Sequence, residues 1–282
     1  MYSLLLLGTP FWLLQAFAFG FGVILGSFLN VYIYRFHTGK SLAGHSHCLS
    51  CGTRLCWFEL FPLVSYLILR GKCRSCGCAI PARYFLVELV TGLLFAGVLM
   101  LTLDLVKVTM LWALLALLVV ITVYDLYHFI IPDELTITVS FIAVGLAGYQ
   151  YWLLPDFLGV GYNLGAALLG SLFFFTLWFV SKGTWLGFGD VKLALPLGFA
   201  LGYQSVFSFV VMSFWIGAVV SLAVIGWQKL RFKLQRGKGG LHLPGEAITM
   251  KSAVPFAPFL VASFITILFT HFDVLRLFQF SI

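Results

Sequence analysis

Charged residues are scarce in this chain. Only 10% of its 282 residues are Asp, Glu, Lys or Arg, whereas 61% are hydrophobic and the mean hydropathy is +1.04. Soluble domains carry about 25% charged residues, so this balance excludes a soluble globular protein. The composition instead indicates an all-α polytopic membrane protein, since a helix satisfies its own backbone hydrogen bonds in lipid.

Three further absences narrow the class. No small-residue cleavage pattern follows the first apolar run, so residues 11–33 are expected to be a retained span rather than a removed signal peptide. Obvious internal repeats are absent, which argues against a repeat-built transporter. There is also no glycine-rich nucleotide loop of the usual soluble type, so contacts to a nucleotide-like ligand cannot be assigned to particular residues.

Eight apolar segments predict about eight transmembrane helices. The sixth is short and can be tilted or partly re-entrant. We therefore expect a first helix within residues 1–33, a small cytoplasmic domain over 34–83 and a membrane domain over 84–282. Packing between helices in lipid favours small residues, and the pattern Gly22-x-x-x-Gly26 fits that need. The segments are 11–33, 84–102, 108–126, 135–153, 162–181, 191–203, 206–227 and 255–271.

The basic residues are distributed unevenly. Of 17 Lys and Arg, 15 lie in segments 34–83, 182–192 and 228–254, and only Lys107 and Arg276 lie elsewhere. With eight spans, the three segments fall on one side, and the positive-inside rule places that side in the cytoplasm and both termini outside. The net charge of +7 is thus explained by topology, with anionic membrane lipid as the nearest partner and no nucleic acid.

All six cysteines lie in the 34–83 segment, and four form two C-x-x-C pairs. Each pair makes a tight turn that points two sulfurs at one ion, and a reducing compartment favours metal over disulfides. The 21 residues between the pairs suit a structural zinc ion bound by four thiolates. The predicted ligands are Cys48, Cys51, Cys73 and Cys76.

The cysteine pattern also allows other interpretations. Cys78, His45 or His47 could replace one ligand, and Cys56 is spare. A redox C-x-x-C or plain reduced thiols are the alternatives to a metal. A nucleic-acid-binding finger also uses this pattern, but its attachment between two spans argues against that function.

Two aspartates stand where a membrane protein rarely places them. Asp125 ends the apolar run 110–124, and Asp190 closes the loop Gly187-Phe188-Gly189-Asp190. A carboxylate in the bilayer is energetically unfavourable and by default indicates function. Both lie at the cytoplasmic ends of their spans, so they can meet. Two close carboxyl groups share a proton, and one can act as base on water while the other acts as acid on a carbonyl oxygen.

The other polar groups near these spans have structural interpretations. Asp133 and Glu134 follow the helix-breaking Pro132, and we expect Asp133 to cap the next helix. Lys192 could orient a carboxylate or bind a lipid phosphate. Glu88 could pair with Arg83 at the interface or contribute to a binding pocket.

These motifs together resemble the bacterial type IV prepilin peptidases, which belong with the GxGD intramembrane aspartyl proteases. G-x-G-D alone is a weak signal, but its conjunction with the thiol pairs and the upstream Asp125 is specific. The resemblance runs through nearly the whole chain. It is carried by Gly26-Ser27-Phe28-Leu29-Asn30-Val31 with Arg35, the thiol pairs with Leu67-Ile68-Leu69-Arg70-Gly71-Lys72-Cys73-Arg74, Arg83-Tyr84 with Val87-Glu88-Leu89, Asp125 with Ile131-Pro132-Asp133, Gly187-Phe188-Gly189-Asp190-Val191-Lys192-Leu193 and Pro255-Phe256-Ala257-Pro258-Phe259.

The resemblance implies a bifunctional enzyme of the bacterial inner membrane. Similar enzymes cut the basic leader from prepilins and pseudopilins, after a Gly, at the cytoplasmic face. Many then methylate the new N-terminal residue with S-adenosylmethionine. Carried over, Asp125 and Asp190 are the catalytic pair, and Cys48, Cys51, Cys73 and Cys76 hold the zinc of the cytoplasmic domain.

The chain departs from the family pattern at three places. Tyr127 stands where many members have a second Asp, so that position is not expected to be essential. Leu49 replaces a Pro in the first thiol pair, which does not affect metal binding. The segment Trp57-Phe58-Glu59-Leu60-Phe61-Pro62 lacks the family's Asn in a region associated with methylation. The alternative function is therefore a prepilin peptidase without methyltransferase activity.

Two functions of other classes compete with the enzyme. A proton-coupled transporter could use Asp125 and Asp190 as a relay, although the large thiol-rich segment is unexplained by it. A membrane-tethered zinc scaffold predicts that Asp125→Asn leaves function intact.

Overall fold

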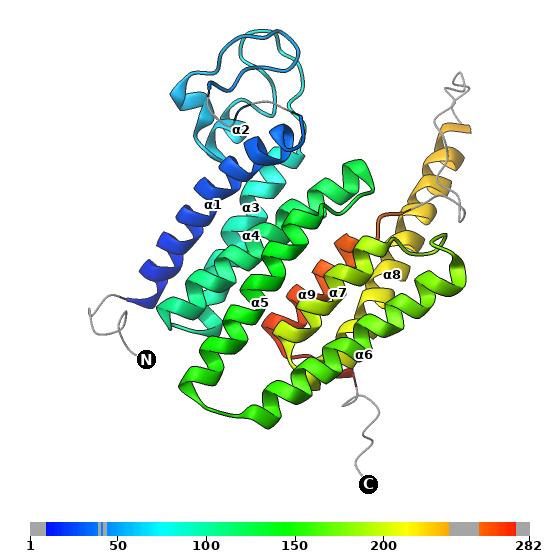
Figure 1. Cartoon of the computed structure of the whole chain (residues 1–282). Helices are drawn as coiled ribbons and strands as arrows, with labels where there is room; N and C mark the ends of the chain where they lie inside the picture. Colours follow the sequence, from blue (N-terminus) through cyan, green and yellow to red (C-terminus); the bar gives the residue numbers. More distant parts are fainter. Residues whose placement is uncertain (1–9, 39–40, 42–43, 237–253, 275–282) are drawn as a thin grey trace. The chain divides into compact units, whose positions relative to one another are not determined.

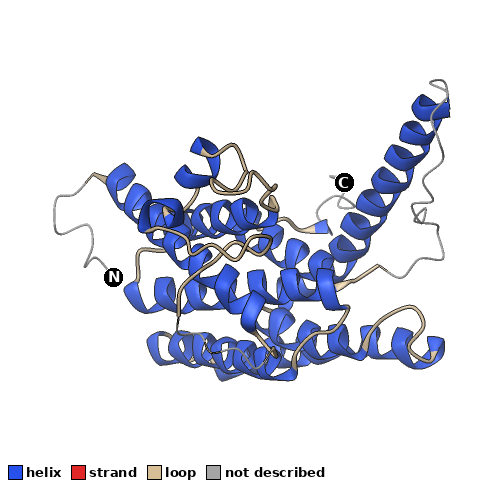
Figure 2. Ribbon diagram, turned by 90° about the horizontal axis from the view of Figure 1, so that it is seen from above, coloured by secondary structure: helices blue, strands red, loops and turns tan. Residues whose placement is uncertain are grey.

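The computed structural model describes residues 10–38, 41, 44–236 and 254–274. Within these ranges every regular element is helical and no strand is present, as Figures 1 and 2 show. The predicted all-α class is confirmed. Each of the eight apolar segments coincides with one helix. These are α1 (Phe11–Arg35), α3 (Arg83–Leu101), α4 (Leu105–His128), α5 (Asp133–Leu153), α6 (Phe157–Ser181), α7 (Phe188–Leu201), α8 (Tyr203–Arg236) and α9 (Ala257–Thr270).

Five helices are long and apolar enough to cross a membrane. They are α1, α3, α4, α6 and the Tyr203–Gln228 part of α8, while α9 is a shorter apolar helix. The chain is thus a multi-pass membrane protein. The total of eight spans remains a prediction, because α5 and α7 do not meet these criteria over the described residues. The basic segment 237–253 lies outside the described residues.

The chain divides into two compact units, residues 1–123 and 124–282, and the division falls within α4. In the first unit, α1 packs along α3 through small residues. A Cβ on Gly22 would lie 2.8 Å from the Thr91 carbonyl oxygen, and one on Gly26 would lie 2.8 Å from the Glu88 Cα. The predicted packing role of Gly22-x-x-x-Gly26 is confirmed, because only glycine permits this backbone approach.

Replacing Gly26 with valine is expected to destabilise the first unit by about 1–3 kcal/mol, the range for overpacked cores. The added side chain would meet the α3 backbone, which cannot yield as a flexible side chain can. Gly20→Val is the matched control on the same helix, since a Cβ there meets nothing within 4 Å. Thermal unfolding of the purified proteins in detergent checks this, and equal melting temperatures for the two variants would contradict the packing.

Between α1 and α3 the chain forms a small domain of loops, here called the cysteine domain (residues 44–82). Its helices are only the 3-10 turn η2 (Trp57–Leu60) and the short α2 (Val64–Ile68). Isolated bridges join His47 to Arg54 and Lys72 to Ala79, one around each C-x-x-C pair. Because this domain has little regular structure and few buried side chains, its fold needs a stabilising element other than a hydrophobic core.

The second unit is organised around α7. This helix contacts α5, α6, α8 and α9, which makes it the central element of the unit. It begins after Gly187, contains Pro196 and ends at Leu201. The next residue, Gly202, has a φ of 84°, which suits glycine. Asp190, in the first turn of α7, therefore belongs to a helix that packs against four others.

Candidate functional site

Asp125 lies in the last turn of α4 and is buried, with 5% of its surface exposed. The helix ends three residues later, and Phe129, with φ of 56°, turns the chain away. The backbone N–H of Ala257, the first residue of α9, donates a hydrogen bond to the Asp125 carboxylate. Ala257 lies in the motif Pro255-Phe256-Ala257-Pro258-Phe259, to which sequence reasoning assigned no role.

Asp190 is the third residue of α7 and is equally buried, at 5% exposure. The backbone N–H of Gly187 donates to its Oδ2 at 3.2 Å, which holds the side chain against the helix start. A Cβ on Gly189 would lie 3.0 Å from the Cβ of Ile131, in the segment just after α4. Glycine at 189 thus lets the G-x-G-D turn pack closely against the chain that follows Asp125.

The two aspartates lie in the same unit and act on each other electrostatically. Asp125 Oδ2 and Asp190 Oδ1 are the buried side-chain N or O atoms that lack a hydrogen-bond partner among the described residues. Leaving such an atom unsatisfied is unfavourable by about 1–3 kcal/mol. Native structures avoid this unless the group has a function. The arrangement presents two carboxyl oxygens, one from each residue, for a substrate or a water molecule.

An ion pair links the starts of α5 and α7. The prediction that Asp133 caps α5 is wrong. Pro132 occupies the capping position without a side-chain hydrogen bond, and Asp133 is the first residue of the helix. The Asp133 carboxylate binds Lys192 instead. Lys192 Nζ lies 2.8 and 3.0 Å from the two Asp133 oxygens. Of the two roles open for Lys192, the structure thus shows the contact to a carboxylate. This pair joins the segment after Asp125 to the helix that carries Asp190.

The cysteine domain gathers a cluster of sulfurs. Cys48, Cys73, Cys76 and Cys78 have Sγ atoms within 4.8 Å of one another. Cys48 Sγ lies 3.9 Å from Cys76 Sγ and 3.5 Å from Cys78 Sγ. Sulfurs about 2.3 Å from a tetrahedral zinc ion lie about 3.8 Å apart, so the cluster has the dimensions of a metal site.

The fourth predicted ligand, Cys51, lies outside this group of four, and its Sγ donates to Thr53 Oγ1 at 3.3 Å. Cys78, considered from the sequence as a replacement ligand, is inside it. The two C-x-x-C turns nevertheless match. The N–H of Gly52 donates to the Cys48 carbonyl oxygen, and that of Gly77 to the Cys73 carbonyl oxygen, both at 2.9 Å.

A second backbone hydrogen bond is also shared by the two C-x-x-C turns, and it shows which residue of the first turn corresponds to Cys78. The N–H of Cys48 donates to the Thr53 carbonyl oxygen, and that of Cys73 donates to the carbonyl oxygen of Cys78. Cys51 in the first turn thus corresponds to Cys76 in the second. Cys78 corresponds to Thr53, and its Sγ supplies the fourth sulfur of the cluster.

The environment of Cys48 favours the form that binds metal. The backbone N–H groups of Cys51 and then Ser50 lower the pKa of the Cys48 thiol to about 6. A thiol with such a pKa is largely ionised at neutral pH, and the thiolate is the metal ligand. The donor set is therefore chemically suited to a soft or borderline cation such as Zn²⁺.

Comparisons with known proteins place these features in two adjoining regions. Residues 21–102 match the bacterial peptidase A24 N-terminal domain, and residues 112–222 match the type IV leader peptidase family. A protein of Aeromonas hydrophila named prepilin leader peptidase/N-methyltransferase is 32% identical over 252 residues, covering 77% of this chain and 83% of the relative. The chain belongs to the type IV leader peptidase family.

Other family members carry the same name. One from Myxococcus xanthus is 37% identical over 221 residues, which cover 76% of this chain and 64% of the relative. One from Burkholderia pseudomallei is 30% identical over 271 residues, or 86% of each chain. No solved structure matches this chain. The leader peptidase match contains Asp125 and Asp190, and the N-terminal match contains all six cysteines.

Proposed function

We propose that this chain is a membrane aspartic endopeptidase that removes the leader of type IV prepilins or pseudopilins and then N-methylates the new N-terminus. The observation that carries the peptidase assignment is the buried pair Asp125 and Asp190, each with an unpaired carboxyl oxygen. The pair lies within the leader peptidase match, and the relatives' names include both activities.

The proposed chemistry uses one proton shared by the two carboxyl groups. The ionised carboxylate takes a proton from water as the water oxygen attacks the carbonyl carbon of the scissile peptide bond. The protonated carboxyl group gives its proton to the carbonyl oxygen. The tetrahedral species then collapses, the C–N bond breaks and a proton moves to the leaving amine nitrogen. Hydrogen bonds from Ala257 and Gly187 would keep the two side chains oriented.

The thiol cluster is proposed to hold a structural zinc ion. The ligands proposed from the two matching turns are Cys48, Cys51, Cys73 and Cys76, with Cys78 able to replace Cys51. Four thiolates leave no open position for water, so the ion would staple the cysteine domain and take no part in hydrolysis. This proposal is supported by the distances in the cluster and by the scarcity of buried side chains around it.

S-adenosylmethionine is the proposed methyl donor, because it supplies an electrophilic methyl group to an amine. The proposed location is the bacterial inner membrane, with the cysteine domain and the aspartates at the cytoplasmic face. The distribution of Lys and Arg supports this orientation. Prepilins or pseudopilins and anionic lipids are the proposed partners.

One experiment tests both activities. Purified enzyme is incubated with a prepilin and S-adenosylmethionine, and the product is analysed by mass spectrometry. Leader loss together with one added methyl group is expected. Cleavage without methylation would leave the peptidase alone, and absence of cleavage with an authentic substrate would contradict the proposal.

The ion pair between Asp133 and Lys192 is expected to position the G-x-G-D turn. Both side chains are partly exposed, and exposed pairs contribute about 0.2–1 kcal/mol. Asp133→Asn or Lys192→Met should therefore lower cleavage by no more than about fivefold. Exchanging the two residues, Asp133→Lys with Lys192→Asp, should recover part of the loss. Initial cleavage rates check this, and complete loss of cleavage in Asp133→Asn would instead indicate a direct role in the chemistry.

A further inference from the structure

The cysteine domain carries a group of large apolar side chains on its surface. All six lie on or between η2 and α2, and each is 42–78% exposed. Large apolar side chains are ordinary on a protein surface when they stand singly, whereas a group of this size marks a surface that binds protein or membrane. The group is here called the η2–α2 patch. Its members are Trp57, Phe58, Phe61, Val64, Leu67 and Ile68.

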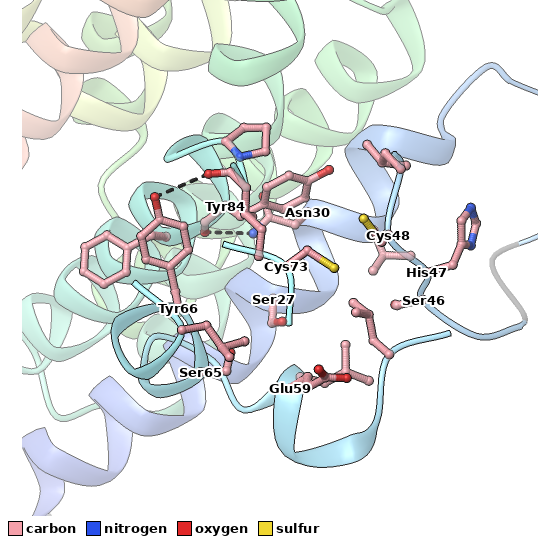
Figure 3. A pocket seen from close by; sticks show the side chains of 18 of the residues that line it. Ser27, Asn30, Ser46, His47, Cys48, Glu59, Ser65, Tyr66, Cys73 and Tyr84 are labelled. Atoms are coloured by element: carbon pink, nitrogen blue, oxygen red, sulfur yellow. Dashed lines mark hydrogen bonds between the residues drawn. The ribbon is translucent and has the colours of Figure 1, made fainter. Parts of the chain in front are cut away.

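Polar side chains of the same segment point inward. Glu59, Ser65 and Tyr66 line a cavity of about 320 Å³ between α1, the start of α3 and the cysteine domain, as Figure 3 shows. Tyr66 Oη donates to the Ile80 carbonyl oxygen at 3.4 Å, a bond that is also drawn there. A segment at a water-exposed surface has the opposite arrangement, with apolar side chains inside and polar side chains outside. The outer face of this segment is therefore suited to an apolar medium.

Two contacts place the segment beside α3. The backbone N–H of Leu63, which lies between η2 and α2, donates to Glu88 Oε2 at 2.8 Å. Glu88 is buried and is the sixth residue of α3. The centre of the Tyr66 ring lies 5.3 Å from that of Phe85, the third residue of α3. The segment thus runs alongside the first two turns of this helix.

The attachment to α3 has a fixed geometry. Leu63 has a φ of 58°, a left-handed conformation that is uncommon for a residue with a side chain, and its bond to Glu88 holds the turn in place. Asn30 Nδ2, on α1, donates to the Tyr84 carbonyl oxygen at the same end of α3 at 3.0 Å. Asn30 and Glu88 also line the cavity. Of the two roles open for Glu88, the structure thus shows the contribution to a pocket.

The length of α3 sets the depth of the segment in the membrane. The helix has 19 residues, which at about 1.5 Å per residue make it about 28 Å long. The hydrocarbon core of a bilayer is about 30 Å thick, so α3 needs its whole length to cross it. The first two turns of α3 therefore lie where lipid headgroups meet acyl chains. The segment beside them lies at the same depth.

The charges around the patch suit anionic lipid. Three exposed basic residues follow α2, namely Arg70, Lys72 and Arg74. The guanidinium carbon of Arg74 lies 5.3 Å from the centre of the Phe58 ring, so this cation is next to the patch. Within residues 54–76 the sequence has four basic residues, and Glu59, which faces the cavity, is its single acid. Basic residues at a membrane surface attract anionic headgroups.

We propose that the η2–α2 patch inserts into the phospholipid bilayer beside α3, with the three basic residues on anionic headgroups. Elements with Trp, Phe and Leu on one side and Lys or Arg nearby bind membranes in this way, and they reach about 5–10 Å into the boundary between headgroups and acyl chains. Trp is favoured at this boundary. The cysteine domain is thereby held on the membrane by its own side chains as well as by α1 and α3. This membrane contact is independent of the enzymatic activities proposed above.

The test is photo-crosslinking of the full-length protein in nanodiscs of phosphatidylethanolamine and phosphatidylglycerol. The photoreactive residue p-benzoylphenylalanine is placed at Trp57 or Ile68, which are 78% and 74% exposed. The control position is His47, an exposed residue that Figure 3 shows on the side of the cavity away from Ser65 and Tyr66. Adducts are identified by peptide mass spectrometry. Lipid adducts at Trp57 and Ile68 should be at least about tenfold more abundant than at His47, because only the patch reaches the acyl chains.

Other occupants of the patch give different adducts. Crosslinks from Trp57 or Ile68 to residues 124–282, to a second copy of the chain or to an added prepilin, in place of lipid, would overturn the proposal. Equal lipid adducts at all three positions would overturn it as well. The melting temperature of each labelled protein should match that of wild type, because both patch side chains are mostly exposed.

Wild type provides a measurement that does not depend on the labelled variants. Oxidation of Trp57 by hydroxyl radicals in nanodiscs should be at least about fivefold slower than in the protein unfolded in guanidinium, because lipid covers a side chain that the chain itself leaves 78% exposed. Peptide mass spectrometry follows the oxidation. Equal rates in the two states would show that Trp57 faces water and would overturn the proposal.

The headgroup contact has its own test. Phosphatidylglycerol should be enriched at least about twofold among the lipid adducts at Ile68, relative to its share of the bilayer, because the basic residues attract it. Arg70→Gln combined with Lys72→Gln should abolish this enrichment. Lys107→Gln, near the start of α4, is the control and should leave it unchanged. Adducts that match the bilayer composition in wild type would overturn the assignment of the basic residues to anionic headgroups.

Discussion

Asp125→Asn and Asp190→Asn are each expected to reduce leader cleavage by at least about 100-fold, the lower end of the contribution of general acid–base catalysis. Asparagine keeps the shape of the side chain but can neither take a proton from water nor give one to the carbonyl oxygen. Initial rates of prepilin cleavage, followed by mass spectrometry, measure the effect. The double variant should be little slower than either single variant, because the two carboxyl groups act as a unit.

The loss of activity should leave the fold intact. Each aspartate has a buried carboxyl oxygen without a hydrogen bond, so removing the charge relieves an unfavourable burial and should not lower the melting temperature. Asp156→Asn is the control in the same unit. It caps α6 by accepting from the N–H of Gly159 at 2.9 Å, and asparagine caps equally well. Near-normal cleavage by Asp125→Asn or Asp190→Asn would contradict the proposal that these two residues form the catalytic pair.

Cys73→Ser is expected to remove most of the bound zinc, from about one ion per chain, and to unfold the cysteine domain. Cys73 is the buried member of the cluster, and a serine hydroxyl is a poor zinc ligand. Binding of structural zinc is itself folding free energy in small domains, so metal and stability are lost together. Elemental analysis and thermal unfolding are the measurements. Cys56→Ser, at an exposed cysteine outside the cluster, is the control.

The same assay separates the roles of the other sulfurs. Cys51→Ser should retain more zinc than Cys73→Ser, because Cys78 lies 3.5 Å from Cys48 and can complete the site. Replacing Cys51 and Cys78 together should remove the ion. Full zinc content in that double variant would show that the ligands proposed here are wrong.

The helices could be predicted from the sequence because each forms locally. In lipid, every apolar segment must satisfy its own backbone hydrogen bonds, so composition alone indicates helix. Breakers such as Pro132 and glycines such as Gly202 then set the ends to within a few residues. The same reasoning could not decide how many helices cross the membrane. The length and composition of α5 and α7 do not meet the usual criteria for a membrane-spanning helix. The order of apolar residues does not show which helices contact lipid.

The candidate residues could also be named from the sequence, since their chemistry is unusual for their surroundings. Carboxylates next to apolar runs and paired C-x-x-C turns stand out in a chain with so few charges. Their partners could not be named. The contacts of Asp125 with Ala257 and of Asp133 with Lys192 join residues that are 132 and 59 positions apart. Neither spacing carries a periodic signal.

The sequence by itself therefore determined the membrane class, the helical segments, the two aspartates and the thiol-rich domain. Only the tertiary structure decided which carboxyl oxygens are left unpaired, that Cys78 joins the sulfur cluster, and that Glu88 and Asn30 wall a cavity. The physical reason is the range of the forces involved. Helix formation depends on neighbours within a few residues, whereas burial and hydrogen bonding of side chains depend on how closely whole helices approach, as Gly22, Gly26 and Gly189 allow here.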